Sequence, residues 1–210
     1  MKWLRWPLLT VAALLWLLTA AAQAMDAKQA EQQWEAFVTL EKKQRQAHLE
    51  TFAEQIKQWL VAEPTSVAAL VWHGTVLESL AREVGGFTGL RYAKQARAQL
   101  EQALELDAEG CNGMAQLRLG LLYERAPGWP VAFGSLKRAE EQFLAALAVR
   151  PEGVDTNFYY AAYLKFLGRN KAAMEHAKQA LAGTPRKGYE VFEQHLQVQA
   201  KDLVGEKGDE

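Results

Sequence analysis

Three stretches of this chain repeat one spacing of small and apolar residues. Within each stretch, four positions are separated by four, three and five residues, and the last position is alanine or the helix-stopping residue proline. The copies are Ala96, Leu100, Ala103 and Ala108; Ala139, Phe143, Ala146 and Pro151; and Ala173, Ala177, Ala180 and Pro185. They begin 43 and 34 residues apart. Repeats of this length cannot bury their apolar faces alone, so they stack into an elongated array.

The apolar residues beyond Met25 also recur at helical spacing, without long strand-like alternation. The sequence therefore predicts an all-α protein built from helix pairs. We expect one or two helices within 27–62 and a closing helix over 187–203. The first helices of the pairs are expected at 67–83, 112–124 and 155–167, and the second helices at 89–107, 135–149 and 170–182.

The repeated positions resemble the tetratricopeptide repeat (TPR), a helix–turn–helix unit of about 34 residues. Leu119-Gly120 followed by Tyr123 matches the first helix of that unit, as do Gly74 with Leu77 and Ala161 with Leu164. The resemblance covers roughly residues 50–185. It implies a short TPR-like α-solenoid of antiparallel helix pairs with N- and C-terminal capping helices. The implied divisions are a cap at 25–64, three repeats within 65–185 (about 67–110, 112–153 and 154–187), and a closing helix with a polar tail at 186–210.

Residues 1–24 have the pattern of a secretory signal peptide. Lys2 and Arg5 precede an apolar run, and Ala22-Gln23-Ala24 forms a small-x-small cleavage site. We expect cleavage after Ala24, and hence a periplasmic or secreted protein with no other membrane segment. The alternative is an uncleaved N-terminal membrane anchor.

Charge and cysteine content exclude several classes of function. Lysine and arginine total 24 and aspartate and glutamate 25, giving a formal net charge of −1. A nucleic-acid partner is not expected, because phosphate binding needs an excess of basic residues. The single cysteine, Cys111, excludes an intrachain disulfide scaffold and a multi-cysteine metal site.

Two turns between paired helices carry extra residues, at about 83–89 and 126–134. Both turns are expected at one edge of the array, where repeat proteins often bind partners. Pro127 and Pro130 stiffen the second turn, which presents Trp129 and Phe133. These rings either pack the loop onto its own repeat or form a wall of a ligand groove.

The second turn and the following segment 151–160 are also similar to exported bacterial TPR proteins related to the T-component associated with TRAP transporters. That resemblance implies a hydrophobic or small organic ligand, and a homo-oligomer beside a solute-binding protein. It covers mainly residues 65–185.

In a TPR-like array the first helices line the concave face. The expected ligand- or partner-binding residues there and on the second turn are Val71, Thr75, Leu117, Leu121, Glu124, Trp129, Phe133, Asn157, Phe158, Tyr160 and Lys165. This surface is mostly apolar and therefore needs cover. The N-terminal helical segment, a second subunit and an apolar ligand are the three alternatives.

No catalytic or metal-binding motif stands out in the sequence. The four histidines lack paired metal-ligand spacing, and the three serines lack a nucleophile-elbow motif. We expect a non-catalytic protein without a cofactor. One hypothesis is a small apolar ligand held between Trp129, Phe133 and Phe158, and the alternative is a protein–protein interaction scaffold.

Overall fold

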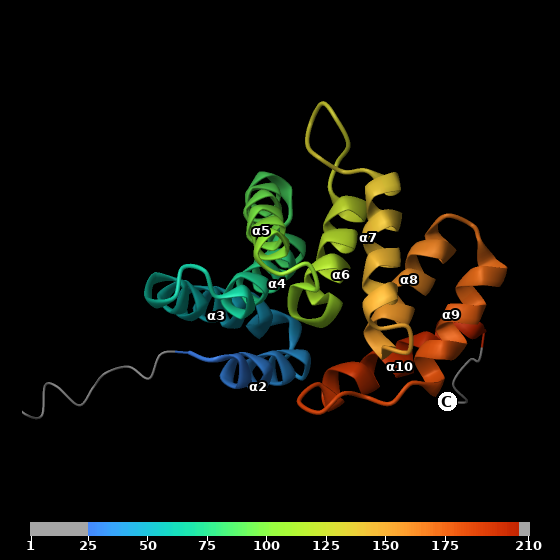
Figure 1. The fold of residues 1–210 in the computed structure, drawn as a ribbon. Helices are drawn as coiled ribbons and strands as arrows, with labels where there is room; N and C mark the ends of the chain where they lie inside the picture. Colours follow the sequence, from blue (N-terminus) through green and yellow to red (C-terminus); the bar gives the residue numbers. More distant parts are fainter. Residues whose placement is uncertain (1–24, 206–210) are drawn as a thin grey trace, which may run out of the picture.

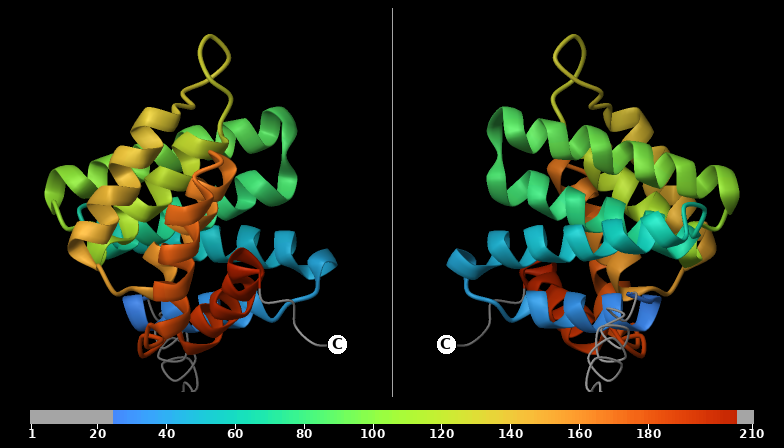
Figure 2. Two further views of the ribbon diagram at one scale, coloured as in Figure 1. Left: turned by 90° about the vertical axis from the view of Figure 1, so that its right-hand side faces the viewer. Right: turned by 90° about the vertical axis from the view of Figure 1, so that its left-hand side faces the viewer.

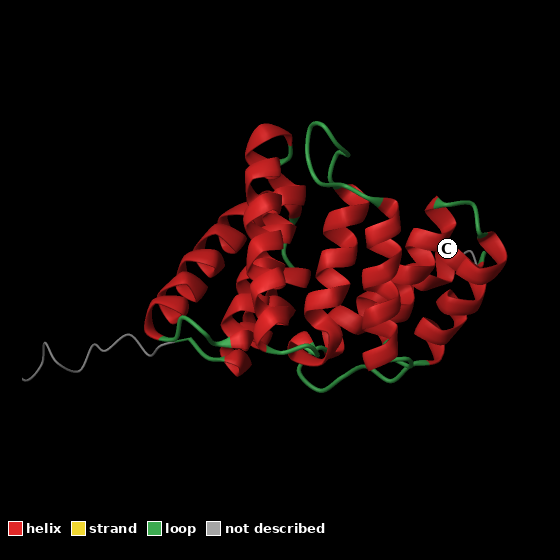
Figure 3. Ribbon diagram, turned by 45° about the horizontal axis from the view of Figure 1, so that its top comes forward, coloured by secondary structure: helices red, strands yellow, loops and turns green. Residues whose placement is uncertain are grey.

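The computed structural model describes residues 25–205, so the signal peptide expected at 1–24 and the last five residues lie outside it. The described part contains helices joined by loops, as Figure 3 shows. The helices are α2 (Ala27–Val38), α3 (Lys42–Ala62), α4 (Val67–Val84), α5 (Gly86–Leu106), α6 (Gly110–Arg125), α7 (Leu136–Val149), α8 (Val154–Phe166), α9 (Asn170–Ala182) and α10 (Glu190–Val204). None of them is both long and apolar enough to cross a membrane.

The all-α, solenoid-like prediction is confirmed. The pairs α4/α5, α6/α7 and α8/α9 follow one another across the molecule in chain order (Figure 1). The observed bounds of α7 and α9 agree with the predicted ranges to within one residue.

The repeated spacing marks the face that each second helix turns toward its partner. Leu100 and Phe143 are buried, and each packs against a glycine of the preceding first helix. A Cβ atom on Gly74 would lie 2.5 Å from Leu100 Cγ, and one on Gly120 would lie 2.8 Å from the Phe143 ring. Glycine at these positions therefore allows the paired helices to approach closely.

The first of the two enlarged turns differs from the prediction. Only Gly85 separates α4 from α5, and residues 86–88, expected in a turn before a helix at 89–107, belong to α5. Gly85 and Gly86 have φ values of 65° and 57°, a left-handed conformation that glycine adopts without strain. This glycine pair reverses the chain directly, so the extra residues lengthen the helices.

The second enlarged turn is a loop, as predicted, and it projects from one side of the molecule (Figure 2). Its base is closed by a hydrogen bond of 2.8 Å from the Gly134 amide to the Pro127 carbonyl. The Ser135 amide donates to the Tyr123 carbonyl at 2.9 Å, and the Ser135 side chain caps α7.

The beginning of α6 also differs from the predicted helix at 112–124. Cys111, Asn112 and Gly113 have left-handed backbone angles, so regular helix begins only at Met114. The Asn112 carbonyl, which this conformation turns away from the helix, accepts a hydrogen bond of 2.7 Å from Arg150 Nε. Sequence periodicity does not predict this turn, because a left-handed backbone leaves no trace in the spacing of apolar residues.

Helices α2 and α10 contact each other on the side of the molecule opposite the 126–135 loop (Figures 1 and 2). The Trp34 ring of α2 lies 6.1 Å from Trp72 of α4 and 5.5 Å from Phe192 of α10. The Glu35 carboxylate accepts hydrogen bonds from the amides of Val191 and Phe192. The two capping helices therefore meet, although simple caps would lie at opposite ends of the array.

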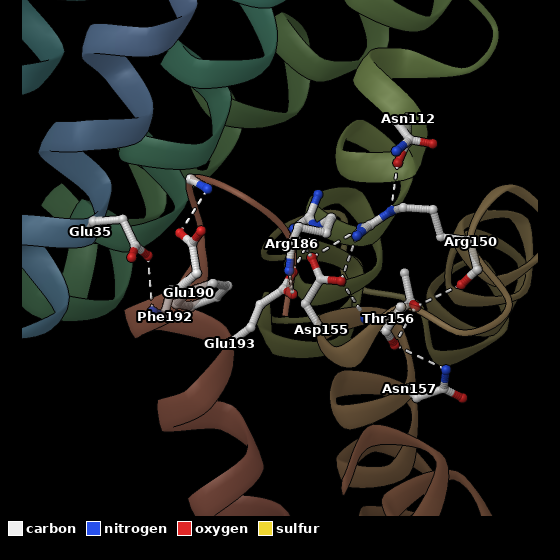
Figure 4. Close-up of polar contacts among 12 residues, drawn as sticks. Glu35, Asn112, Arg150, Asp155, Thr156, Asn157, Arg186, Glu190, Phe192 and Glu193 are labelled. Carbon is white, nitrogen blue, oxygen red and sulfur yellow. Dashed lines mark hydrogen bonds and ion pairs between the residues drawn. The ribbon is translucent and has the colours of Figure 1, made fainter. Parts of the chain in front are cut away.

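A buried polar cluster connects α10 to α8 and to the end of α7 (Figure 4). Asp155 pairs with Arg150 at 2.7 Å and Arg186 at 3.0 Å, and Arg186 also pairs with Glu193. Burial alone raises the pKa of Asp155, but the two guanidinium groups outweigh burial and lower it below its usual value. Asp155 therefore remains ionised and holds the segment before α10 in place.

Candidate functional site

The structure distributes the expected site residues over several environments. Val71, Thr75 and Leu117 are fully buried in the packing of the first helices. Leu121 is also buried, but it lines a pocket beside the inter-helix turns. Phe158 lines a different pocket on the concave face.

Trp129 and Phe133 do not form a common wall with Phe158. Trp129 is 89% exposed on the 126–135 loop. Phe133 packs edge-on against Tyr123, with ring centroids 5.8 Å apart. The guanidinium carbon of Arg97 lies over the Phe133 ring, 4.5 Å from its centroid. The loop is thus fastened by Phe133, whereas Trp129 remains at the surface.

The remaining expected residues have separate positions. Asn157 is buried, donates to the carbonyls of Pro151 and Gly153, and contacts His176 Nδ1 at 2.8 Å. Tyr160 is buried, and its ring centroid lies 4.8 Å from that of His176. Lys165 is exposed. Glu124 is half-buried, and burial raises its pKa. Asn157 and Tyr160 therefore pack the third helix pair.

A pocket of about 430 Å³ lies at the edge where the Gly85 reversal and the 126–135 loop are found. We call it the turn-edge pocket. Most of its walls are apolar and come from α4, α5, α6 and the 126–135 loop. Its lining comprises Glu78, Ala81, Arg82, Gly85, Gly86, Phe87, Gly89, Leu90, Ala93, Leu121, Leu122, Arg125, Ala126, Pro127 and Val131.

The rim of the turn-edge pocket exposes large apolar side chains. Phe87 is 94% exposed and Val131 is 62% exposed. The sequence predicts both turns at the same edge, but Phe87 and Leu90 are not among the site residues expected from it. The helical spacing of Phe87, Leu90 and Ala93 on one face of α5 is the signal that was available.

A second pocket, of about 370 Å³, lies on the concave face between α4, α6, α8 and the terminal helices α2 and α10, with Arg45 of α3 at its edge. We call it the concave pocket. It combines arginines with aromatic rings. Its lining comprises Trp34, Phe37, Val38, Arg45, Arg82, Glu83, Arg118, Arg125, Phe158, Tyr159, Ala162, Phe192, His195, Leu196 and Gln199.

Glu78 lies buried where α4 faces α6, next to residues of both pockets. Its carboxylate pairs with Arg125 at 2.9 Å and with Arg118 at 3.4 Å. Burial raises the pKa of Glu78, but Arg82, Arg125 and Arg118 together lower it below its usual value. Glu78 in turn raises the pKa of Arg82. The cluster therefore keeps its charges at neutral pH.

These arginines are not among the site residues expected from the sequence. Glu78 and Arg82 are four residues apart on α4, and Arg118 and Arg125 are seven residues apart on α6, so each pair occupies one helix face. That spacing was visible, but the meeting of the two faces required the tertiary structure. Within residues 25–205, no group of three or more histidine, cysteine, aspartate or glutamate side chains is placed to hold a metal ion.

The described chain is therefore an all-α, solenoid-like protein with an apolar pocket at its turn edge and an arginine-rich pocket on its concave face. No protein-family model matches the sequence, and no curated protein matches it.

Proposed function

We propose that this chain is an exported, non-catalytic binding protein of the TPR-like class, and that the turn-edge pocket holds a small apolar ligand. The observation that carries the proposal is a pocket of about 430 Å³ with largely apolar walls, within the usual size range for small-molecule sites. Transfer of an apolar ligand from water into such a pocket is favourable.

The polar residues of this pocket support a ligand that is apolar over most of its surface. Glu78 already pairs with Arg118 and Arg125, so its charge is neutralised within the protein. The remaining walls offer methyl, methylene and ring surfaces, including those of Leu90 and Leu122. A role beside a solute transporter, which the sequence resemblance implies, belongs to this proposal.

A protein–protein interaction scaffold is the second candidate. The exposed rings of Phe87 and Trp129 favour it, because large exposed aromatic side chains are common in protein interfaces. A partner that inserts an apolar side chain would use the same pocket and cover both rings.

Native mass spectrometry of protein purified from the exported fraction tests export and ligand retention together. We expect a subunit that begins at Met25 and carries an additional small-molecule mass. A bare subunit with bound protein would favour the scaffold, and a subunit that retains residues 1–24 would contradict cleavage of the signal peptide.

Binding of the uncharged fluorescent dye phenylnaphthylamine tests the pocket itself. Leu90→Glu places a charge in the apolar lining and should weaken dye binding by about tenfold, because an uncharged dye would have to displace the water around that charge. Leu106→Glu is the matched control, since Leu106 is a half-exposed leucine of the same helix outside the pocket. Equal dye binding by the two folded variants would refute a ligand site in this pocket.

A further inference from the structure

The concave pocket has more positive than negative groups in its lining. Arg45, Arg82, Arg118 and Arg125 face one acidic lining residue, Glu83, with Glu78 buried beside them. Glu78 is shared by Arg118 and Arg125. Within residues 25–205, Arg45 and Arg82 form no ion pair shorter than 4.0 Å.

Arg118 is the most unusual group in this pocket. Its side chain is only 3% exposed, and its Nε has no hydrogen-bond partner among the described residues. The hydrogen bond that it donates to Glu78 is long, at 3.4 Å. A buried donor without an acceptor destabilises a protein, so an acceptor bound in the pocket would complete the site.

Neighbouring acidic residues do not supply that acceptor. The charge of Arg118 helps to lower the pKa of Asp155, but the Asp155 carboxylate is already paired with Arg150 and Arg186. Glu124 lies near Arg125 and Glu78, and it is not a hydrogen-bond partner of Arg118 Nε, which has none among the described residues.

Aromatic rings surround the arginines and provide flat apolar surfaces. The Arg118 guanidinium carbon lies 4.8 Å from the Trp34 ring centroid and 5.9 Å from those of Tyr159 and Phe192. Phe158 and Phe37 complete the ring-lined walls. An aromatic ligand would gain ring contacts of the kind that stabilise aromatic pairs.

We infer that the concave pocket binds a small aromatic carboxylate, with the carboxylate at the arginines and the ring between Trp34, Phe158 and Phe192. Arginine pairs with the planar carboxylate through two parallel hydrogen bonds. The volume of about 370 Å³ is sufficient for one small molecule, and residues of α2 and α10 form part of the lining. This site adjoins the turn-edge pocket, with which it shares Arg82 and Arg125, and differs from it in chemistry.

Titration calorimetry with phenylacetate, and with its uncharged analogue phenylacetamide, tests the inference on the purified protein. We expect phenylacetate to bind about tenfold more tightly than phenylacetamide, since both ligands carry the same ring. Binding of neither ligand, or equal binding of both, would overturn the inference.

Two variants locate the binding in the concave pocket. Arg45→Gln removes one lining charge and should weaken phenylacetate binding by about fivefold. Ala162→Trp places a large ring at a half-buried lining position on α8 and should abolish phenylacetate binding. Arg91→Gln, the same charge change at an exposed site on α5, is the matched control. Replacement of Arg118 itself is avoided because this residue is buried.

The variants also separate this site from the turn-edge pocket. Ala162→Trp should retain phenylnaphthylamine binding, and Leu90→Glu should retain phenylacetate binding. Wild-type affinity for phenylacetate in folded Ala162→Trp would place the carboxylate elsewhere and refute the inference.

Discussion

Cys111 is the sole cysteine of the chain, and its surroundings determine its reactivity. The side chain is half-buried against the core in the left-handed segment at the start of α6. Burial, with a smaller effect of the Asp107 carboxylate, raises the pKa of the thiol to about 11. At neutral pH the thiol is therefore protonated, and the protonated thiol is a poor nucleophile.

We predict that Cys111 reacts slowly with a disulfide reagent in the folded protein. At pH 8 a thiol of pKa about 11 holds about 100-fold less thiolate than one of pKa about 9, and the rate should fall accordingly. The rate should continue to rise with pH up to at least pH 9. Urea-unfolded protein provides the reference rate, and equal rates in the two states would contradict the prediction.

At the scale of the helical element, the close approach of paired helices depends on glycines opposite bulky side chains. Gly120 of α6 faces the Phe143 ring of α7, and Gly74 of α4 faces Leu100 of α5 in the preceding pair. Glycine is unfavourable inside a helix, so its presence at both positions reflects packing rather than helix propensity.

We predict that Gly120→Ala lowers the free energy of unfolding by about 1–2 kcal/mol. The new Cβ atom would lie 2.8 Å from the buried Phe143 ring, and overpacking of about 1–3 kcal/mol exceeds the gain of about 0.5–1 kcal/mol in helix propensity. Urea unfolding measures the change.

The double variant Gly120→Ala/Phe143→Leu gives the control for this prediction. Because the smaller leucine leaves room for the new methyl group, Gly120→Ala should lower the free energy of unfolding by less in the Phe143→Leu background than in the wild type. Additive effects of the two substitutions would show that the glycine–ring contact is not the cause.

At the scale of the whole molecule, the contact between α2 and α10 closes the concave face. The Glu35 carboxylate accepts hydrogen bonds from the amides of Val191 and Phe192, which are 156 and 157 positions away in the sequence. A carboxylate at a helix N-terminus satisfies free amide groups and interacts favourably with the helix dipole. The concave pocket therefore exists only while both terminal helices are docked.

We predict that Glu35→Gln lowers the free energy of unfolding by about 0.5–2 kcal/mol. It should also increase amide hydrogen exchange in both α2 and α10, because each helix docks on the other. Glu105→Gln, at an exposed site on α5, should change neither quantity. Faster exchange confined to α2 would argue against mutual docking of the two helices.

The sequence by itself determined the class of fold and the pairing of helices. The spacing of Ala139, Phe143 and Ala146 marks one buried face of α7, and a spacing of three to four residues is a local property of a helix. For the same reason the bounds of α9 were predictable. The short reversal at Gly85 was not, since a positive φ leaves no trace in that spacing. The left-handed turn at Cys111 was not either, since the neighbouring Asn112 carbonyl contacts Arg150 at the end of α7, 38 residues away.

Only the tertiary structure decided what covers the concave face and where the pockets lie. Val71 and Leu117 were correctly placed on first helices, but they are buried by packing that no local spacing reports. Glu78 and Arg118 are 40 residues apart and meet only because α4 lies beside α6. Local periodicity selects the face of each helix, whereas the partner of that face is set by the path of the whole chain.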